Sequence, residues 1–108
     1  KDKNYRLAVL SNNDSRLRSV LRELQVDHLF EQLFISSELG FEKPQREIFQ
    51  AVEETLEVTP QEIMHLGDSY SRDYLGAQKS GWNPVLYGSD TRAKVHIQKF
   101  HQLLNLLS

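Results

Sequence analysis

The chain has 108 residues, a formal net charge of −2 and no cysteine. Its length is that of one small domain, and its weak negative charge argues against nucleic-acid or anionic-membrane partners, which need clustered lysine and arginine. The lack of cysteine excludes disulfides and thiolate metal sites. Because the sequence also has no run of about 20 apolar residues, we expect a cytoplasmic protein.

Short apolar runs alternate with segments of helical periodicity along the chain. This pattern is typical of an α/β protein in which helices cover both faces of a parallel sheet. The first run, residues 7–10, has the continuous apolar character of a strand that is buried on both faces. The expected elements are strand 7–10, a helix from Asp14 or Ser15 to Leu24 with Leu17, Val20, Leu21 and Leu24 on one face, strand 33–35, helix 44–56, a helical turn at 59–62, strand 63–66, helix 71–79, strand 85–87 and a terminal helix from Ile97 to Leu107.

Two aspartates, Asp68 and Asp73, follow the expected strand 63–66 in the run Gly-Asp-Ser-Tyr-Ser-Arg-Asp. Ligands bind beyond the carboxyl ends of parallel strands, and two carboxylates that meet there repel each other unless a hard cation such as Mg²⁺ lies between them. The structural alternative is that Asp68 ends a strand and Asp73 caps a helix. His65, inside the apolar strand, is interpreted as a core histidine.

Two further landmarks lie upstream. Ser11 and Asn12 follow the first strand, where such residues most often end strands and cap helices. Lys43 precedes Pro44, and a residue before proline is held in an extended backbone, so this lysine is presented at a defined point where a helix begins. Taken singly, a loop lysine is usually solvated.

In this order the three landmarks resemble the haloacid dehalogenase-like (HAD) hydrolase superfamily over roughly residues 5–88. Ser11 matches the second motif of the superfamily, Lys43 the third, and Gly67-Asp68 with Asp73 the fourth. The resemblance implies a Rossmann-like α/β core. The first motif is an aspartate nucleophile with a second aspartate two residues on, and no aspartate of this sequence begins such a pair. We therefore expect residues 1–108 to be the C-terminal portion of a HAD-like core domain, without its first strand and cap.

The resemblance also implies a chemistry, namely phosphoryl transfer through an aspartyl-phosphate. Asp68 and Asp73 would hold Mg²⁺, Lys43 would neutralise charge beside the nucleophile, and Ser11 would bind a phosphoryl oxygen with help from Asn12. The implied catalytic residues are thus Ser11, Lys43 and Asp68, and the substrate would be a small phosphorylated metabolite. Without a nucleophile the chain alone is expected to be inactive.

Two alternatives to a phosphatase stay open. The acidic pair favours a phosphatase over a dehalogenase-type hydrolase, since halide-removing members of the superfamily need no metal. A truncated, non-catalytic binding or assembly module is the alternative from another class.

In the resembled fold the nucleophile strand lies between the serine strand and the acidic-pair strand, so its removal would leave unpaired strand edges. We expect those edges to require the missing segment, a swapped strand or direct closure.

Overall fold

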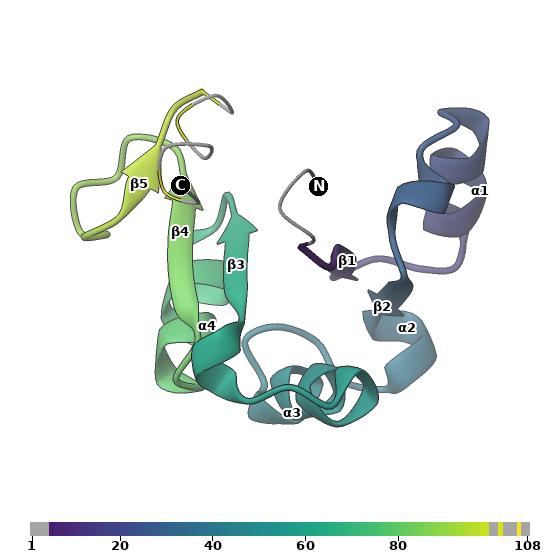
Figure 1. Cartoon of the computed structure of the whole chain (residues 1–108), viewed down its shortest axis with the longest axis horizontal. Coiled ribbons are helices and arrows are strands. Elements are labelled where there is room, and N and C mark those ends of the chain that lie inside the picture. Colours follow the sequence, from purple (N-terminus) through teal and green to yellow (C-terminus); the bar gives the residue numbers. More distant parts are fainter. Residues whose placement is uncertain (1–4, 100–101, 103–105, 107–108) are drawn as a thin grey trace. The chain divides into compact units, whose positions relative to one another are not determined.

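The computed structural model describes residues 5–99, 102 and 106, and the chain divides into two compact units, residues 1–43 and 44–108. Each unit holds parallel strands connected through helices (Figure 1). The α/β class expected from the alternating pattern is therefore confirmed.

The first unit is built on two parallel strands. β1 pairs with β2 in a register that places Ser11 opposite Ile35, so both strands end at the same edge. Phe34 and Ile35 are buried, because β2 carries two large apolar residues at its carboxyl end. The elements of this unit are β1 (Ala8–Ser11), α1 (Arg16–Glu23), the 3₁₀ turn η1 (Asp27–Leu29), β2 (Gln32–Ile35) and α2 (Ser36–Leu39).

The expected burial of β1 on both faces is wrong. Ala8 is exposed, the rest of β1 is half-buried, and α1 contains no buried residue. Val20 is 46% and Leu24 is 65% exposed. Two strands of four residues present too little apolar surface to cover a helix face. The helix is nevertheless amphipathic, as the spacing of its apolar residues predicts.

The second unit contains three parallel strands in the order β3-β4-β5. Thr59, at the N-terminus of the helical turn expected at 59–62, donates its backbone N–H to the Glu62 carboxylate over 2.9 Å, and the turn is confirmed. The elements are α3 (Arg46–Leu56), the 3₁₀ turn η2 (Pro60–Glu62), β3 (Met64–Gly67), the π-helical turn η3 (Tyr70–Tyr74), α4 (Leu75–Lys79), β4 (Asn83–Tyr87) and β5 (His96–Ile97).

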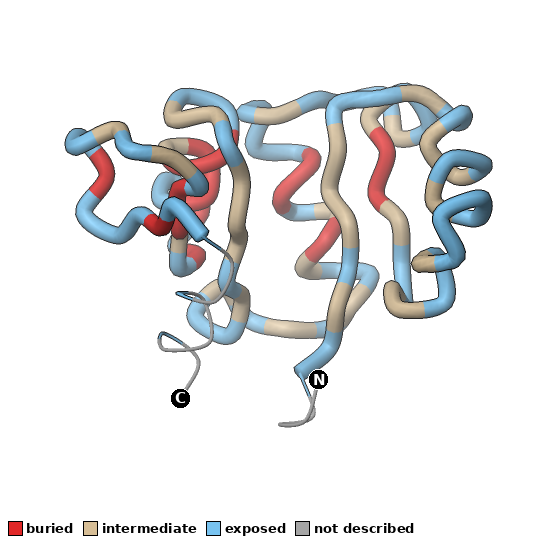
Figure 2. Tube along the Cα trace, turned by 90° about the horizontal axis from the view of Figure 1, so that it is seen from above, coloured by how far each residue is buried: buried red, intermediate tan, exposed pale blue. Residues whose placement is uncertain are grey.

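The buried residues of the second unit lie on α3, η3, α4, β4 and β5 and in the segments that flank β4 (red in Figure 2). Phe49 of α3 is completely buried, and a Cβ on Gly76 of α4 would lie 2.7 Å from its Cζ. Only glycine at position 76 lets the two helices approach this closely. The buried apolar side chains of this unit are Ile48, Phe49, Val52, Tyr74, Ala77, Trp82, Val85, Leu86, Ala93 and Ile97.

The expected terminal helix does not begin at Ile97. Ile97 lies in β5 and pairs with Tyr87, because the outer edge of β4 takes up a further parallel strand. The rest of that expectation rests on residues that lie outside the described part of the chain: Phe100, Leu103, Leu104 and Leu107.

Each unit has a strand with one unpaired edge among residues 5–99. β1 pairs with β2 alone, and β3 pairs with β4 alone. These are the strands that carry the serine and the acidic motifs. Within the described residues no helix is long and apolar enough to cross a bilayer.

Candidate active site

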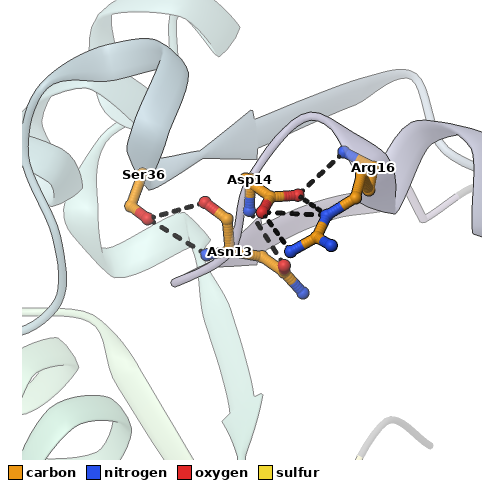
Figure 3. Close-up of polar contacts among 4 residues, drawn as sticks. All are labelled: Asn13, Asp14, Arg16 and Ser36. Carbon is orange, nitrogen blue, oxygen red and sulfur yellow. Dashed lines mark hydrogen bonds and ion pairs between the residues drawn. The ribbon is translucent and has the colours of Figure 1, made fainter.

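The carboxyl end of β1 carries two of the expected site residues. Ser11 is the last residue of the strand, is half-buried, and is followed by the exposed Asn12. The chain then turns, because Ser36 Oγ donates to the carbonyl of Asn13 and accepts from its N–H at 3.1 and 3.0 Å (Figure 3). The start of α2 thereby fixes the loop that follows Ser11.

Lys43 contacts this same strand end. Its Nζ donates to the carbonyl of Leu10 over 3.2 Å, and the lysine side chain is partly buried. Its backbone N–H donates to Oδ1 of Asn12 over 2.8 Å, and its carbonyl accepts from Nδ2 of Asn12 over 3.1 Å. The structure therefore brings Asn12 and Lys43 together beside Ser11, although 31 residues separate the two in sequence.

Ion pairs surround the loop. Arg16 holds the pKa of Asp14 below its usual range through hydrogen bonds to the carboxylate (Figure 3). Arg18 of α1 and the hydroxyl of Ser15 lower the pKa of Glu38 on α2 to about 2. Because Glu38 lies on α2, these contacts join the two helices that follow β1 and β2.

The acidic motif belongs to the second unit and begins where β3 ends. Asp68 directly follows Gly67 and is exposed. Asp73 lies on η3 and is only 4% exposed. Its Oδ1 is 2.9 Å from Nε2 of His65, and its Oδ2 accepts the backbone N–H of Ser69 over 3.1 Å. The two aspartates thus differ: one is at the surface and the other is enclosed by protein donors.

Gly67 makes room for the Asp73 carboxylate. A Cβ at position 67 would lie 2.2 Å from Cγ and 2.4 Å from Oδ2 of Asp73. Any other residue there would have to displace the side chain of Asp73. The glycine of the motif is required by this close approach of a side chain to the strand.

His65 also lies under this loop, a contact that sequence reasoning missed. It packs at right angles to Phe49 and Trp82, with ring centroids 6.2 and 5.9 Å away, which agrees with its interpretation as a core histidine. The signal that could have revealed the contact is the period of two along a strand, which places His65 and Gly67 on the same face of β3. The side chain of Asp73 lies against that face, next to both residues.

The π-helical turn η3 is held from outside by the segment between β4 and β5. The Tyr74 hydroxyl accepts the backbone N–H of Lys94 over 2.9 Å. The guanidinium of Arg92 lies 4.1 Å from the ring centroid of Tyr70, which stacks on Tyr74. The loop that carries Asp68 therefore precedes a turn that is fixed on two sides. Irregular helical turns of this type are frequent at functional sites.

The donor set of this loop fits a divalent cation in part. The exposed Asp68 carboxylate is a hard oxygen ligand of the kind that Mg²⁺ prefers. Both carboxylate oxygens of Asp73 accept hydrogen bonds from the protein, a geometry that suits the shaping of the loop. No group of three or more metal-ligating side chains occurs within the described residues. Metal binding by Asp68 and Asp73 stays a prediction.

Comparison with known proteins identifies the family. A family model described as haloacid dehalogenase-like hydrolase matches residues 1–81. The chain belongs to this hydrolase family. The family expected from the serine, lysine and acidic motifs is thereby confirmed.

Curated relatives of the chain include hydrolases. An uncharacterized hydrolase of Schizosaccharomyces pombe is 40% identical over 88 residues, which are 76% of this chain and 39% of the relative. The glyceraldehyde 3-phosphate phosphatase of Methanothermobacter thermautotrophicus is 33% identical over 102 residues, 92% of this chain and 45% of the relative. The chain therefore spans less than half the length of these two relatives.

Solved structures of HAD proteins share the fold. A HAD phosphatase from Thermococcus onnurineus superimposes with a TM-score of 0.93 at 25% identity, over 99% of this chain and 52% of that one. A HAD hydrolase from Bacillus subtilis bound to magnesium has a TM-score of 0.89 at 23% identity, over 98% of this chain and 50% of that one. The HAD-like fold expected from the motifs is confirmed over about half of each neighbour.

Proposed function

We propose that this chain forms part of a Mg²⁺-dependent phosphohydrolase that works through an aspartyl-phosphate. The observation that carries the proposal is the position of the Lys43 ammonium, 3.2 Å from the Leu10 carbonyl and next to the end of β1. A cation and the Ser11 hydroxyl at one strand end suit the negative oxygens of a phosphoryl group, whose charge they would stabilise during transfer. The relationship to a named phosphatase supports this reaction class.

The proposed nucleophile is the aspartate of a D-x-D motif in a segment outside these 108 residues. Its carboxylate oxygen attacks phosphorus while the bond between phosphorus and the leaving-group oxygen breaks, and that oxygen takes up a proton from solvent as it leaves. Water then cleaves the aspartyl-phosphate, which restores the carboxylate and releases inorganic phosphate. Residues 1–108 would thus be the C-terminal portion of the catalytic domain and inactive by themselves.

Magnesium, when bound, would screen the negative phosphate from the negative nucleophile. Asp68 is the residue of this chain best placed to bind it, because its carboxylate is exposed at the end of β3. Asp73 would hold the loop in shape and face the ion through water. A small phosphorylated metabolite is the proposed substrate class, in keeping with the substrate named for the Methanothermobacter relative.

A non-catalytic assembly module is the second candidate. The unpaired edges of β1 and β3 favour it, because an exposed edge can pair with a strand of another molecule. Strand exchange between copies of the chain would then produce oligomers without any hydrolysis. A dehalogenase-type hydrolase differs from the leading candidate in needing no metal.

The deciding experiment uses a polypeptide that joins this chain to a segment bearing a D-x-D motif. Hydrolysis of an aryl phosphate is measured with and without Mg²⁺. We expect Mg²⁺-dependent activity that falls by at least about 100-fold in Asp68→Asn and in Lys43→Ala. Asp27→Asn and Lys79→Ala are matched controls, since both change an exposed charge outside the motifs.

The outcomes separate the candidates. Activity that survives both Asp68→Asn and Lys43→Ala would contradict the assigned roles. Hydrolysis of a haloacid without metal would favour the dehalogenase. Oligomers without activity, in a polypeptide that contains the D-x-D segment, would favour the assembly module.

A further inference from the structure

The side-chain amide of Asn12 makes two hydrogen bonds to a single residue, Lys43. Its Oδ1 accepts the Lys43 N–H over 2.8 Å, and its Nδ2 donates to the Lys43 carbonyl over 3.1 Å. Both backbone polar groups of Lys43 are thus bound by one side chain from a distant part of the sequence. This contact imitates the pairing between two strands, but it is made by a side chain.

The lysine is held at its other end as well. Nζ of Lys43 donates to the carbonyl of Leu10, two residues before Asn12. The same short segment therefore binds the backbone and the ammonium of Lys43. A lysine side chain has several rotatable bonds, so the position of its charge depends on where its backbone is anchored.

The segment around Lys43 needs such an anchor. It begins at Gly40, whose φ of +84° ends α2, and it continues into Pro44, which has no N–H to donate. Lys43 itself lies outside any helix or strand. Its position is consequently set by contacts of the kind that Asn12 supplies.

We propose that Asn12 is a positioning residue that places the Lys43 ammonium at the end of β1, and that it does not bind the phosphoryl group itself. This inference rests on the proposed phosphohydrolase function and refines the substrate-binding role that the family resemblance implies for Asn12. The amide oxygen and one N–H of Asn12 are already directed at Lys43. Loss of the amide would leave the charge of Lys43 present but misplaced.

A double-mutant cycle tests this inference in the polypeptide that joins the chain to a D-x-D segment. The variants are Asn12→Ala, Lys43→Ala and the two combined, and the readouts are kcat, KM and the Kd for inorganic phosphate in the presence of Mg²⁺. Asn12→Ala is expected to lower kcat by about 100-fold, since a misplaced catalytic group costs about that much. It should weaken phosphate binding by about tenfold, and it should have no further effect on phosphate binding once Lys43 is alanine.

Asn13→Ala is the matched control. Asn13 is the neighbouring residue of the same type, and its side-chain oxygen accepts a local bond from the Asp14 N–H over 2.9 Å. This variant should leave phosphate binding within about twofold of the parent. Asn12→Ser, a milder truncation, repeats the cycle if Asn12→Ala does not fold, and thermal unfolding of every variant separates instability from misplacement.

Each outcome has one meaning. If Asn12→Ala still weakens phosphate binding in the Lys43→Ala background, Asn12 binds phosphate directly and the inference is wrong. An effect no larger than that of Asn13→Ala also overturns it. If Lys43→Ala changes neither hydrolysis nor phosphate binding, the proposed function itself fails, a result that is distinguishable from the other two.

Discussion

The carboxylate of Asp73 lies directly against the α-carbon of Gly67. A methyl group at that α-carbon would be 2.2 Å from Cγ of Asp73, far inside van der Waals contact. The last residue of β3 and the acidic residue of η3 are therefore mutually dependent, and each limits what the other position can hold.

Gly67→Ala should destabilise the protein by about 1–3 kcal/mol, because the added methyl group forces Asp73 away from His65 and Ser69. Urea unfolding of a folded polypeptide containing this chain measures the change. Gly40→Ala is the control for backbone strain alone, since Gly40 has φ +84° but open space around its α-carbon. If Gly67→Ala and Gly40→Ala had equal effects on the stability and on the activity, the steric explanation would be contradicted.

His65→Phe should also destabilise, by about 1–3 kcal/mol, although it preserves an aromatic ring against Phe49 and Trp82. The lost stability comes from the hydrogen bond to the buried Asp73 carboxylate. Denaturant unfolding of His65→Phe, Asp73→Asn and the double variant checks this. We expect the double variant to be more stable than the sum of the single effects predicts, and strict additivity would show that the pair does not interact.

Trp82→Phe should cost about 1 kcal/mol, because Trp82 Nε1 donates to the Glu53 carboxylate over 2.8 Å. The edge-to-face contact with Phe49, at 5.0 Å between centroids, can persist with the smaller ring. Thermal unfolding of Trp82→Phe and Glu53→Gln is the measurement, with Glu54→Gln as the control on an exposed neighbour. A large effect of Glu54→Gln would point to helix charge as the cause.

Glu38 should make the stability depend on pH in the acid range. Its pKa is lowered to about 2 by Arg18 and Ser15, so the folded state binds this proton more weakly than the unfolded state does. The contribution of the carboxylate is therefore complete above its ordinary pKa of 4.5 and is lost as the pH falls towards 2. Between pH 2 and 4.5, the free energy of unfolding should change less with pH in Glu38→Gln than in the parent.

Glu54→Gln, on the surface of α3, is the control for that measurement and should leave the slope unchanged. If Glu38→Gln retains the full acid dependence of the parent, the ion pair with Arg18 does not contribute to the stability in solution. Raising the salt concentration should reduce the difference between the two proteins, because the pair is partly exposed.

The strands were predictable because their apolar runs have no helical period. Leu33-Phe34-Ile35 became the buried end of β2, and the run before Gly67 became β3. The closeness of Lys43 to the first strand end followed only from the family resemblance, since nothing local in the sequence reveals a contact across 31 positions. Because nothing local in the sequence reveals such a contact, the two hydrogen bonds between Asn12 and Lys43 were also not predicted.

Other features were hidden because tertiary contacts decide them. Ile97 has the spacing of a helical residue, yet the open edge of β4 draws it into a parallel strand. Leu24 has the spacing of an apolar helix face and is nevertheless exposed, because periodicity reports an apolar face but not what covers it. Asp68 and Asp73 were expected to hold Mg²⁺ together, directly or through water, and their spacing did not reveal that one carboxylate is exposed and the other buried.

Phe49 lies between α3 and α4 and packs against the imidazole of His65, which is hydrogen-bonded to the buried carboxylate of Asp73. It sits on the helix whose first turn begins shortly after Lys43. Replacement of this ring would therefore disturb the imidazole and the glycine-bounded turn without touching either aspartate. Phe49 thus couples the hydrophobic core of the second unit to the position of the Asp73 carboxylate.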